Sequence, residues 1–223
     1  MKKKRVIIYT TGDEIFTFPC VYRICTQLNS KYKLDLFIEK PTFSRKLKVL
    51  ITFILFSSIF KLFKLYKKKT SINDILNIND VKIITRSDKN YSFGISFNFP
   101  KRIKLKKYKI FNFHLGNFSN QRGSFIYLYM YKFKWKKIDL TFHEINEKFD
   151  SGLIIKKKTI DISNRDSIDV CSLYTENYDF IKKCLSIIIQ NRRKKPNKVG
   201  KLNIEPTYSE ILKIYFKILF RLI

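Results

Sequence analysis

Strand-like and helix-like segments alternate over residues 5–39, and this order limits the fold more than any other feature. Arg5–Thr10 is an apolar run of strand length, and Lys33–Glu39 is a second strand candidate. Between them, Phe16–Leu28 is predicted to form a helix with Pro19 in its first turns. A strand, a helix and a strand in this order are typical of a βαβ unit with buried parallel strands. We therefore predict an α/β fold with a doubly wound, mostly parallel sheet and helices on both faces.

The same alternation continues along the chain. Further strands are predicted at Val81–Thr85, Phe93–Phe97, Ile110–Phe113, Leu140–Ile145 and Leu153–Ile162. Further helices are predicted at Ser71–Leu76, Gly123–Trp135 and Asp166–Ile189, the last capped by Ser163 or Asn164. Ser71 and Asp74 have the spacing of a capping box. The turn Thr11-Gly12-Asp13 lacks Gly-x-Gly-x-x-Gly, so this Rossmann-like pattern has no dinucleotide fingerprint.

Two apolar segments lie outside this regular pattern. Val49–Phe60 is an uncharged run between Lys48 and Lys61, and it falls short of the roughly 20 residues that span a bilayer. We favour a helix packed on the sheet or on a partner over a membrane-surface helix. After the basic linker Arg192–Pro196, Tyr208–Ile223 is predicted to be a basic amphipathic helix. It could dock on the domain, pair with a second subunit in a homodimer, or lie on a membrane.

The charge balance is strongly basic, with 46 Lys and Arg against 18 Asp and Glu and a net charge of +28. Such a balance is typical of proteins that bind nucleic acid or anionic membranes. The lysines are spread over most predicted elements, however, in a chain rich in Lys, Ile, Asn, Phe and Tyr. We therefore favour a compositional origin. Nucleic acid is not the expected partner, and peripheral membrane contact stays open.

The four cysteines predict a reduced protein without a metal site. They are Cys20, Cys25, Cys171 and Cys184. They form no Cys-x-x-Cys pair, and only two histidines accompany them, so no metal-ligand cluster is expected. We expect mostly buried thiols in a cytoplasmic protein. The basic N-terminus is followed by a short strand rather than by the long apolar core of a signal sequence.

The segment from Lys109 to Gly152 contains the residues best suited to chemistry. Asn112 and His114 alternate on a predicted strand and so share one face, and Asp150 follows the next strand. Each residue alone fits an ordinary role, since polar residues occur at sheet edges and Asp is common in turns. Together, an Asn, a His and an Asp at two strand ends are typical of a strand-end active site.

The order of motifs in this segment resembles the formyltransferase family that uses 10-formyltetrahydrofolate. The matching elements are Asn112-Phe-His114, Arg122-Gly123, Leu140-Thr-Phe-His143 and Asp150-Ser-Gly152, with Gly94–Pro100 upstream. The order and the spacings agree from about residue 92 to residue 160. A lone Asn-x-His would carry no weight, but the combination is fairly specific. The resemblance implies a formyltransferase domain over residues 1–190 and a basic linker with a helical tail over residues 191–223.

The resemblance also implies roles for individual residues. Asn112 and His114 would polarise and hold the formyl oxygen, while Asp150 would orient His114 and take the amine proton. Arg122 and Gly123 would shape the loop over the reacting centre. His143 and Gly152 would support the site rather than react. The positions that match folate-contacting segments are Phe97, Asn98, Phe99, Asn146, Glu147, Lys148 and Phe149. The formyl donor would be 10-formyltetrahydrofolate, and no metal is expected.

The acceptor amine is less constrained than the chemistry. Leu115–Ser119 and Ile126 lack prolines that are usual at these places in the family. The residues after position 190 are too few for the C-terminal barrel of the tRNA-modifying members. By elimination, the leading acceptor is an amino sugar on a nucleotide carrier, and methionyl-tRNA or another amine is the alternative. A non-catalytic basic module that binds RNA or a membrane surface is the rival from another class. The intact Asn112, His114 and Asp150 argue against that rival.

Overall fold

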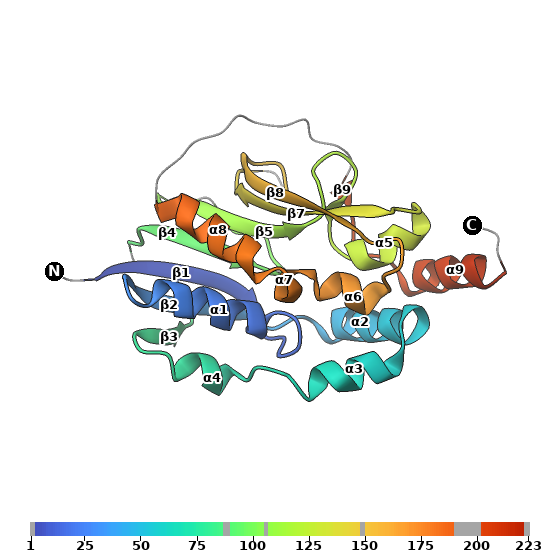
Figure 1. Cartoon of the computed structure of the whole chain (residues 1–223), viewed down its shortest axis with the longest axis horizontal. Helices are drawn as coiled ribbons and strands as arrows, with labels where there is room; N and C mark the ends of the chain where they lie inside the picture. The colour runs from blue at the N-terminus through green and yellow to red at the C-terminus, as the bar shows by residue number, and fades with distance from the viewer. Residues whose placement is uncertain (1–2, 87–89, 105–106, 148–149, 190–201, 221–223) are drawn as a thin grey trace.

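The computed structural model describes residues 3–86, 90–104, 107–147, 150–189 and 202–220. Within these residues, the centre is a seven-stranded sheet in the order β3-β2-β1-β4-β5-β7-β8 (Figure 1). Its strands are β1 (Lys4–Thr11), β2 (Tyr32–Glu39), β3 (Val81–Ile84), β4 (Phe93–Phe97), β5 (Ile110–Leu115), β7 (Lys137–Glu144) and β8 (Ile154–Asp161). The predicted α/β class is confirmed, and each predicted strand is present with small shifts at its ends.

One strand of the sheet, β7, runs against all the others. The strands from β3 to β5 are parallel to their neighbours, whereas β7 runs antiparallel to both β5 and β8. The order also reverses between β1 and β4, which makes the carboxyl ends of these two strands the usual ligand-binding crevice of an open α/β sheet. The antiparallel register pairs Asn112 with His143 and His114 with Thr141. Both histidines of the chain therefore lie on adjacent strands.

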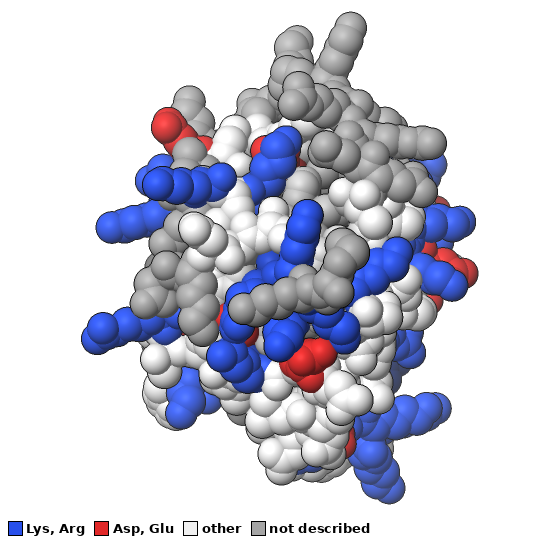
Figure 2. All heavy atoms as spheres, turned by 90° about the vertical axis from the view of Figure 1, so that its left-hand side faces the viewer, with Lys and Arg blue, Asp and Glu red and all other residues white. Residues whose placement is uncertain are grey.

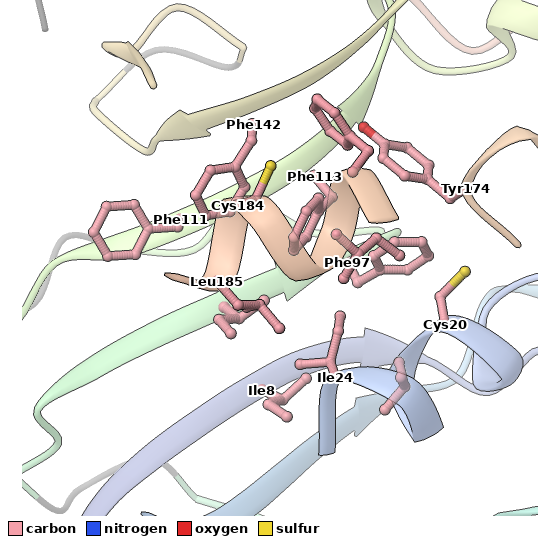
Figure 3. Packing of buried hydrophobic residues seen from close by; sticks show 14 of the residues in the cluster. Ile8, Cys20, Ile24, Phe97, Phe111, Phe113, Phe142, Tyr174, Cys184 and Leu185 are labelled. Atoms are coloured by element: carbon pink, nitrogen blue, oxygen red, sulfur yellow. The ribbon is translucent and has the colours of Figure 1, made fainter. Parts of the chain in front are cut away.

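The main core lies between one face of the sheet and a layer of helices. These helices are α1 (Phe18–Leu28), α4 (Ile72–Leu76), α6 (Ser167–Cys171), α7 (Leu173–Glu176) and α8 (Tyr178–Ile189). Figure 3 shows Ile24 of α1 and Leu185 of α8 close to Ile8 of β1, with Phe97, Phe113 and Tyr174 beside them. Fully buried aliphatic and aromatic side chains of this kind supply most of the stabilisation of such a layer.

The opposite face has a different cover. Ile7 and Tyr9 alternate with Val6 and Ile8, so they point away from the helices. They pack with Tyr91 and Ile110 and with partly buried rings that include Phe99 and Tyr108. We expected helices on both faces, but in the described part of the chain the aromatic residues after β4 cover this second face. Paired rings such as Tyr9 and Phe99, whose centroids lie 5.5 Å apart, fill the space that a helix would occupy.

Helix boundaries follow the local capping signals. Ser71 and Asp74 form the predicted capping box at the start of α4. The single helix predicted for Asp166–Ile189 is wrong, because the segment forms α6, α7 and α8 in succession. It starts with a capping box between Asp166 and Asp169, not with Ser163 or Asn164. Asn177 ends α7 with its side chain bonded back to the Leu173 carbonyl, which breaks the helix before α8.

A second, smaller core joins the C-terminal helix to the domain. It involves α2 (Phe43–Phe56), α5 (Ile126–Lys132) and α9 (Tyr208–Leu219), and α3 (Ile59–Tyr66) follows α2. Ile211 and Ile214 of α9 are buried against Phe56 of α2 and Leu128 of α5. Glu205 pairs with Arg45 and Lys48 of α2 just before α9 begins. The sequence left open whether this helix docks on the domain, pairs with a second subunit or lies on a membrane. The structure shows that α9 docks on the domain.

The predicted uncharged run Val49–Phe60 crosses the break between α2 and α3. Ser57 and Ser58 separate the two helices, and Phe53 and Phe56 of α2 are buried. Among the described residues, every helix falls short of the length and apolar character that crossing a bilayer requires. The run therefore packs partly on the domain, as we favoured from the sequence.

Basic side chains are spread over the surface of the protein. Figure 2 shows lysines and arginines both at the centre and around the rim of one face, mixed with uncharged and acidic residues. This even spread of basic side chains is consistent with a basic charge that follows from the overall composition.

All four cysteines are free, and Cys20, Cys25 and Cys184 are buried. Burial raises the pKa of these three thiols, so they stay protonated and unreactive.

Candidate active site

Two neighbouring strands supply the fixed half of the candidate site. Asn112 and His114 lie on β5, and His143 lies opposite Asn112 on β7. The Asn112 amide nitrogen lies 3.1 Å from His143 Nε2. His114 and His143 are buried, with exposed fractions of 6% and 1%. The strand pairing therefore sets the relative positions of these three side chains.

Asp150 approaches them from the loop between β7 and β8. Its Oδ1 lies 3.5 Å from the Asn112 amide nitrogen, 3.5 Å from His114 Nδ1 and 3.8 Å from His143 Nε2. Its Oδ2 accepts a hydrogen bond of 3.0 Å from the backbone N–H of Gly123. The backbone of Asp150 has φ 43°, in the left-handed region that Asp tolerates better than most residues. The structure thus brings the three predicted catalytic residues together around one carboxylate.

His143 is neutral, which fixes the orientation of Asn112. Burial is the main reason that the pKa of His143 is lowered to about 4; the Asp150 carboxylate opposes this shift and the nearby His114 adds to it. Its Nδ1 lies 3.1 Å from the Glu144 carbonyl, which can only accept, so Nδ1 carries the proton. Nε2 is then an acceptor and receives a hydrogen bond from the Asn112 amide. The Asn112 NH₂ group is therefore directed into the cluster.

His114 and Asp150 face each other inside the cluster. His114 Nε2 lies 2.9 Å from the Gln121 carbonyl, which can only accept, so Nε2 is a donor. The other ring nitrogen, Nδ1, lies 3.5 Å from Asp150 Oδ1. A carboxylate beside a ring nitrogen is an arrangement expected of groups that receive and pass on a proton.

The loop after β5 closes over the histidines. Gly116 has φ +125°, and a Cβ there would lie 2.1 Å from the Gln121 carbonyl oxygen, so only glycine fits. Asn117 accepts hydrogen bonds from the backbone of Ser119 and Asn120, which folds the loop into a turn. The buried ring of Phe118 then lies edge-on to His143, with centroids 4.7 Å apart. This loop lacks the expected prolines but is still held in one defined shape.

Sequence reasoning did not identify three residues that hold the cluster. They are Gln121, whose carbonyl holds His114, Phe118, and Tyr174 of α7. The Tyr174 hydroxyl donates to the His114 carbonyl at 2.7 Å and lies 3.2 Å from the Thr141 carbonyl, linking β5 to β7. The Asn-x-Ser turn at Asn117 was the one available signal for the loop. Tyr174 carries no local signal, because its contact joins residues 60 positions apart.

The C-terminal segment borders the site loop. β6 (Arg122–Gly123) pairs in parallel with β9 (Leu202–Asn203), and Ser124 N–H donates to the Asn203 carbonyl. Gly123 has φ +98°, and a Cβ there would lie 2.0 Å from that same carbonyl oxygen. The Tyr129 hydroxyl of α5 donates to the Ile204 carbonyl at 2.9 Å. A segment that the sequence assigned to a separate tail therefore helps to position Gly123, which in turn holds Asp150.

The predicted folate-contacting side chains are placed unequally. The rings of Phe97 and Phe99 are turned into the two cores, where they meet Tyr174 and Tyr9 respectively. Asn98 lies between them with φ 51° and donates to Thr17 Oγ1 at 2.9 Å. A contact from residues 97–99 to a ligand would therefore come from the backbone. Residues 97–99 lie at the carboxyl end of β4, next to the crevice where the strand order reverses between β1 and β4.

The remaining predicted positions lie in the β7–β8 loop. Asn146 and Ser151 bond across it, with Ser151 Oγ 2.6 Å from Asn146 Oδ1, and the Glu147 carbonyl accepts from Arg102. A Cβ at Gly152 would lie 1.6 Å from the Glu144 carbonyl oxygen, so glycine is required for this turn. Lys148 and Phe149 lie outside the described residues. Among the residues described, no group of His, Cys, Asp and Glu is arranged to hold a metal ion.

Comparison with known proteins identifies the fold. No protein-family model and no curated protein matches the chain. Among solved structures, a 4-N formyltransferase from Francisella tularensis matches 95% of this chain and 86% of its own, at 20% identity and a TM-score of 0.61. WlaRD, a sugar 3N-formyl transferase solved with dTdp and 5-N-formyl-THF, matches 92% of this chain and 70% of its own, at 18% identity and a TM-score of 0.61.

Part of a larger protein has a similar fold. HypX from Aquifex aeolicus, in complex with tetrahydrofolic acid, matches 92% of this chain at 15% identity and a TM-score of 0.56. The match covers only 30% of HypX, so this chain corresponds to one part of that protein. The fold of this chain is therefore the formyltransferase fold.

Proposed function

We propose that the protein transfers a formyl group from 10-formyltetrahydrofolate to a primary amine. The observation that carries the proposal is the Asp150 carboxylate, whose Oδ1 faces both the Asn112 amide and His114 Nδ1 at 3.5 Å inside a largely buried cluster. Acyl transfer to an amine needs donors for a developing oxyanion and a base for the amine proton. The fold shared with solved formyltransferases supports the same reaction.

The residues present fit a formyl donor. When bound, 10-formyltetrahydrofolate supplies the electrophilic formyl carbon. Asn112 presents its NH₂ group because His143 Nε2 accepts one of its hydrogens. The His114–Asp150 contact of 3.5 Å is longer than the roughly 2.7–2.9 Å of a charge-assisted hydrogen bond. When both ring nitrogens of His114 carry a proton, Nδ1 can therefore donate to an oxygen placed beside Asn112.

Asp150 then handles the amine proton. As the amine nitrogen bonds to the formyl carbon, a proton must leave that nitrogen, and Oδ1 is the base within reach. Oδ2 stays bonded to the Gly123 N–H, which keeps the carboxylate oriented. The folate nitrogen that leaves the formyl carbon would need a proton. His114 would deliver one and then recover the proton that Asp150 took from the amine, since Nδ1 and Oδ1 lie 3.5 Å apart.

We propose an amino sugar on a nucleotide carrier as the acceptor. WlaRD is described as a sugar 3N-formyl transferase solved with dTdp, and the Francisella protein as a 4-N formyltransferase. The net charge of +28 would attract a diphosphate carrier. Methionyl-tRNA or another amine stays the alternative acceptor. The cytoplasmic location expected from the sequence also remains a prediction.

The test is a screen of amine acceptors with 10-formyltetrahydrofolate. The panel holds nucleotide-linked amino sugars, free amino sugars and methionyl-tRNA, and mass spectrometry detects the formylated product. We expect product only with a nucleotide-linked amino sugar and only when the donor is present. The Asp150→Asn variant is the control, because it should bind folate without turnover.

Folate binding separates the enzyme from a non-catalytic module. Calorimetric titration with a stable reduced folate should show saturable binding. No binding at millimolar ligand, together with salt-sensitive binding to RNA, would refute the proposed function.

A further inference from the structure

Helix α3 exposes a stripe of aromatic side chains to solvent. Its sequence is IFKLFKLY, and none of its described side chains is buried. Phe60 is 81% exposed, Phe63 62% and Tyr66 54%. Residues three apart lie on one side of a helix, so these three rings form a single stripe. Leu62 and Leu65 are half-buried. The stripe therefore leaves a large apolar surface in contact with solvent.

Ion pairs, rather than apolar packing, hold α3 in place. Lys61 lies 2.9 Å from Asp166 and 2.7 Å from Asp169, at the start of α6. Just beyond the helix, Lys69 lies 2.9 Å from Glu14 and covers the Tyr66 ring at 4.7 Å. Both ends of α3 are thus tied to the domain by lysines. Figure 1 shows α3 at the outer edge of the molecule, beyond α2.

Lysines dominate the charge around the stripe, because in the described part of the chain the acidic residues there, Asp166, Asp169 and Glu14, pair only with Lys61 and Lys69. Lys64, Lys67 and Lys68 are exposed, and none of them forms an ion pair with another described residue. The sequence has no Asp or Glu between Lys40 and Asn73. Exposed aromatic rings beside unpaired lysines are the composition of helices that lie in the headgroup region of an anionic bilayer. Aromatic rings enter that region while lysine ammonium groups remain at the phosphates.

We propose that α3 is an interfacial anchor that holds the protein on the surface of an anionic lipid bilayer. The helix is too short to span the bilayer, so binding is peripheral and depends on both the rings and the lysines. Charge complementarity favours lipid over a second copy of this chain, because the surface around α3 is basic in both copies. The inference is independent of the proposed formyl transfer, since it uses no residue of the catalytic cluster.

The first experiment measures cosedimentation of the full chain with vesicles. One set contains only phosphatidylcholine, and the other also contains phosphatidylglycerol. We expect binding to the anionic vesicles, little binding to the neutral ones, and release by salt. Phe60→Ser combined with Phe63→Ser should weaken binding about tenfold. Phe43→Ser is the matched control, because Phe43 is 80% exposed at the start of α2, away from the stripe.

The second experiment separates α3 from the general basic charge. Lys67→Glu with Lys68→Glu should weaken binding by about tenfold or more. Lys182→Glu with Lys183→Glu on α8 changes the net charge equally, and both lysines are exposed, so it should have little effect. Circular dichroism and urea unfolding verify that each variant is folded.

Three results would overturn the proposal. The first is an equal loss of vesicle binding in the Lys67 and Lys68 variant of α3 and in the Lys182 and Lys183 variant of α8. The second is a loss of vesicle binding in Phe43→Ser equal to that in the Phe60 and Phe63 variant. The third is a dimer on gel filtration that the Phe60 and Phe63 changes dissociate, with no binding to either vesicle.

Discussion

The two halves of the candidate site are built in different ways. Asn112, His114 and His143 project from β5 and β7, whose pairing continues through the whole sheet. Asp150 lies in the β7–β8 loop and Gly123 in the two-residue strand β6; both have positive φ, and they meet through a single hydrogen bond of 3.0 Å. The strand half is fixed by many cooperative contacts, and the loop half by few. We infer that changes in the loop half act on turnover, whereas changes behind the strand half act on stability.

The largest expected effect comes from the loop half. Asp150→Asn keeps the shape and the left-handed backbone but removes the base, and should lower kcat by about 10³-fold. Folding and folate binding should survive, as measured by circular dichroism and calorimetry. Near wild-type turnover in this variant would show that Asp150 is not the base.

The matching change in the strand half should be nearly as large. His114→Ala removes a donor to the oxyanion and should lower kcat by about a hundredfold or more. Because His114 and Asp150 act as one pair, the double variant should be little worse than Asp150→Asn alone. A simple product of the two losses would mean that the residues act separately.

A third change tests whether the loop half depends on its backbone. Gly123→Ala places a Cβ on the Asn203 carbonyl and should cost about 1–3 kcal/mol of stability, with Asp150 displaced from its bond. We expect kcat to fall while folate affinity changes little. Gly12→Ala is the matched control, since its Cβ would meet only a side-chain carbon of Ile38 at 3.7 Å. If Gly123→Ala and Gly12→Ala had the same kcat and the same stability, the proposed role of β9 in positioning Gly123 and Asp150 would be refuted.

The smallest effect concerns the support behind the strand half. The pKa of His143 is lowered to about 4 in the folded protein, against about 6.5 unfolded. As pH falls through this window the unfolded state binds the proton first, so stability is lost. Between pH 7.5 and pH 5 the loss attributable to His143 should be about 2 kcal/mol.

Urea unfolding at the two pH values measures this loss. In His143→Gln this part of the pH dependence should disappear, while kcat falls less than in His114→Ala. If the free energy of unfolding of the Gln variant depended on pH as in the wild type, the lowered pKa of His143 in the folded protein would be refuted.

The strand half could be predicted from sequence because its signals are local. Period-two alternation places Asn112 and His114 on one face, and the apolar runs locate the strands of the main sheet to within a few residues at each end. The loop half could be predicted only in part. β6 and β9 are two residues each, too short to show any periodicity, and they join positions about eighty residues apart.

Burial could not be predicted from local pattern either. Phe97 matches a folate-contacting position in the sequence, yet its ring packs in the core against Phe113 and Tyr174. The aromatic cover of the second face arises because residues after β4 fold back onto the sheet, and no local pattern marks this return. The break at Asn177 depends on a side chain competing with the helix backbone, which an apolar repeat does not reveal.

The pairing of β6 with β9 ties activity to the order of protein synthesis. On the ribosome, Arg122–Gly123 emerges well before Leu202–Asn203, so the main sheet can form while Gly123 still lacks its partner strand. A chain whose translation stops before residue 202 would retain the strands of the main sheet but not the contact that sets the loop beside Asp150. Under the proposed function, such a chain would have only the strand half of the site in place, so its turnover should resemble that of the Gly123→Ala variant.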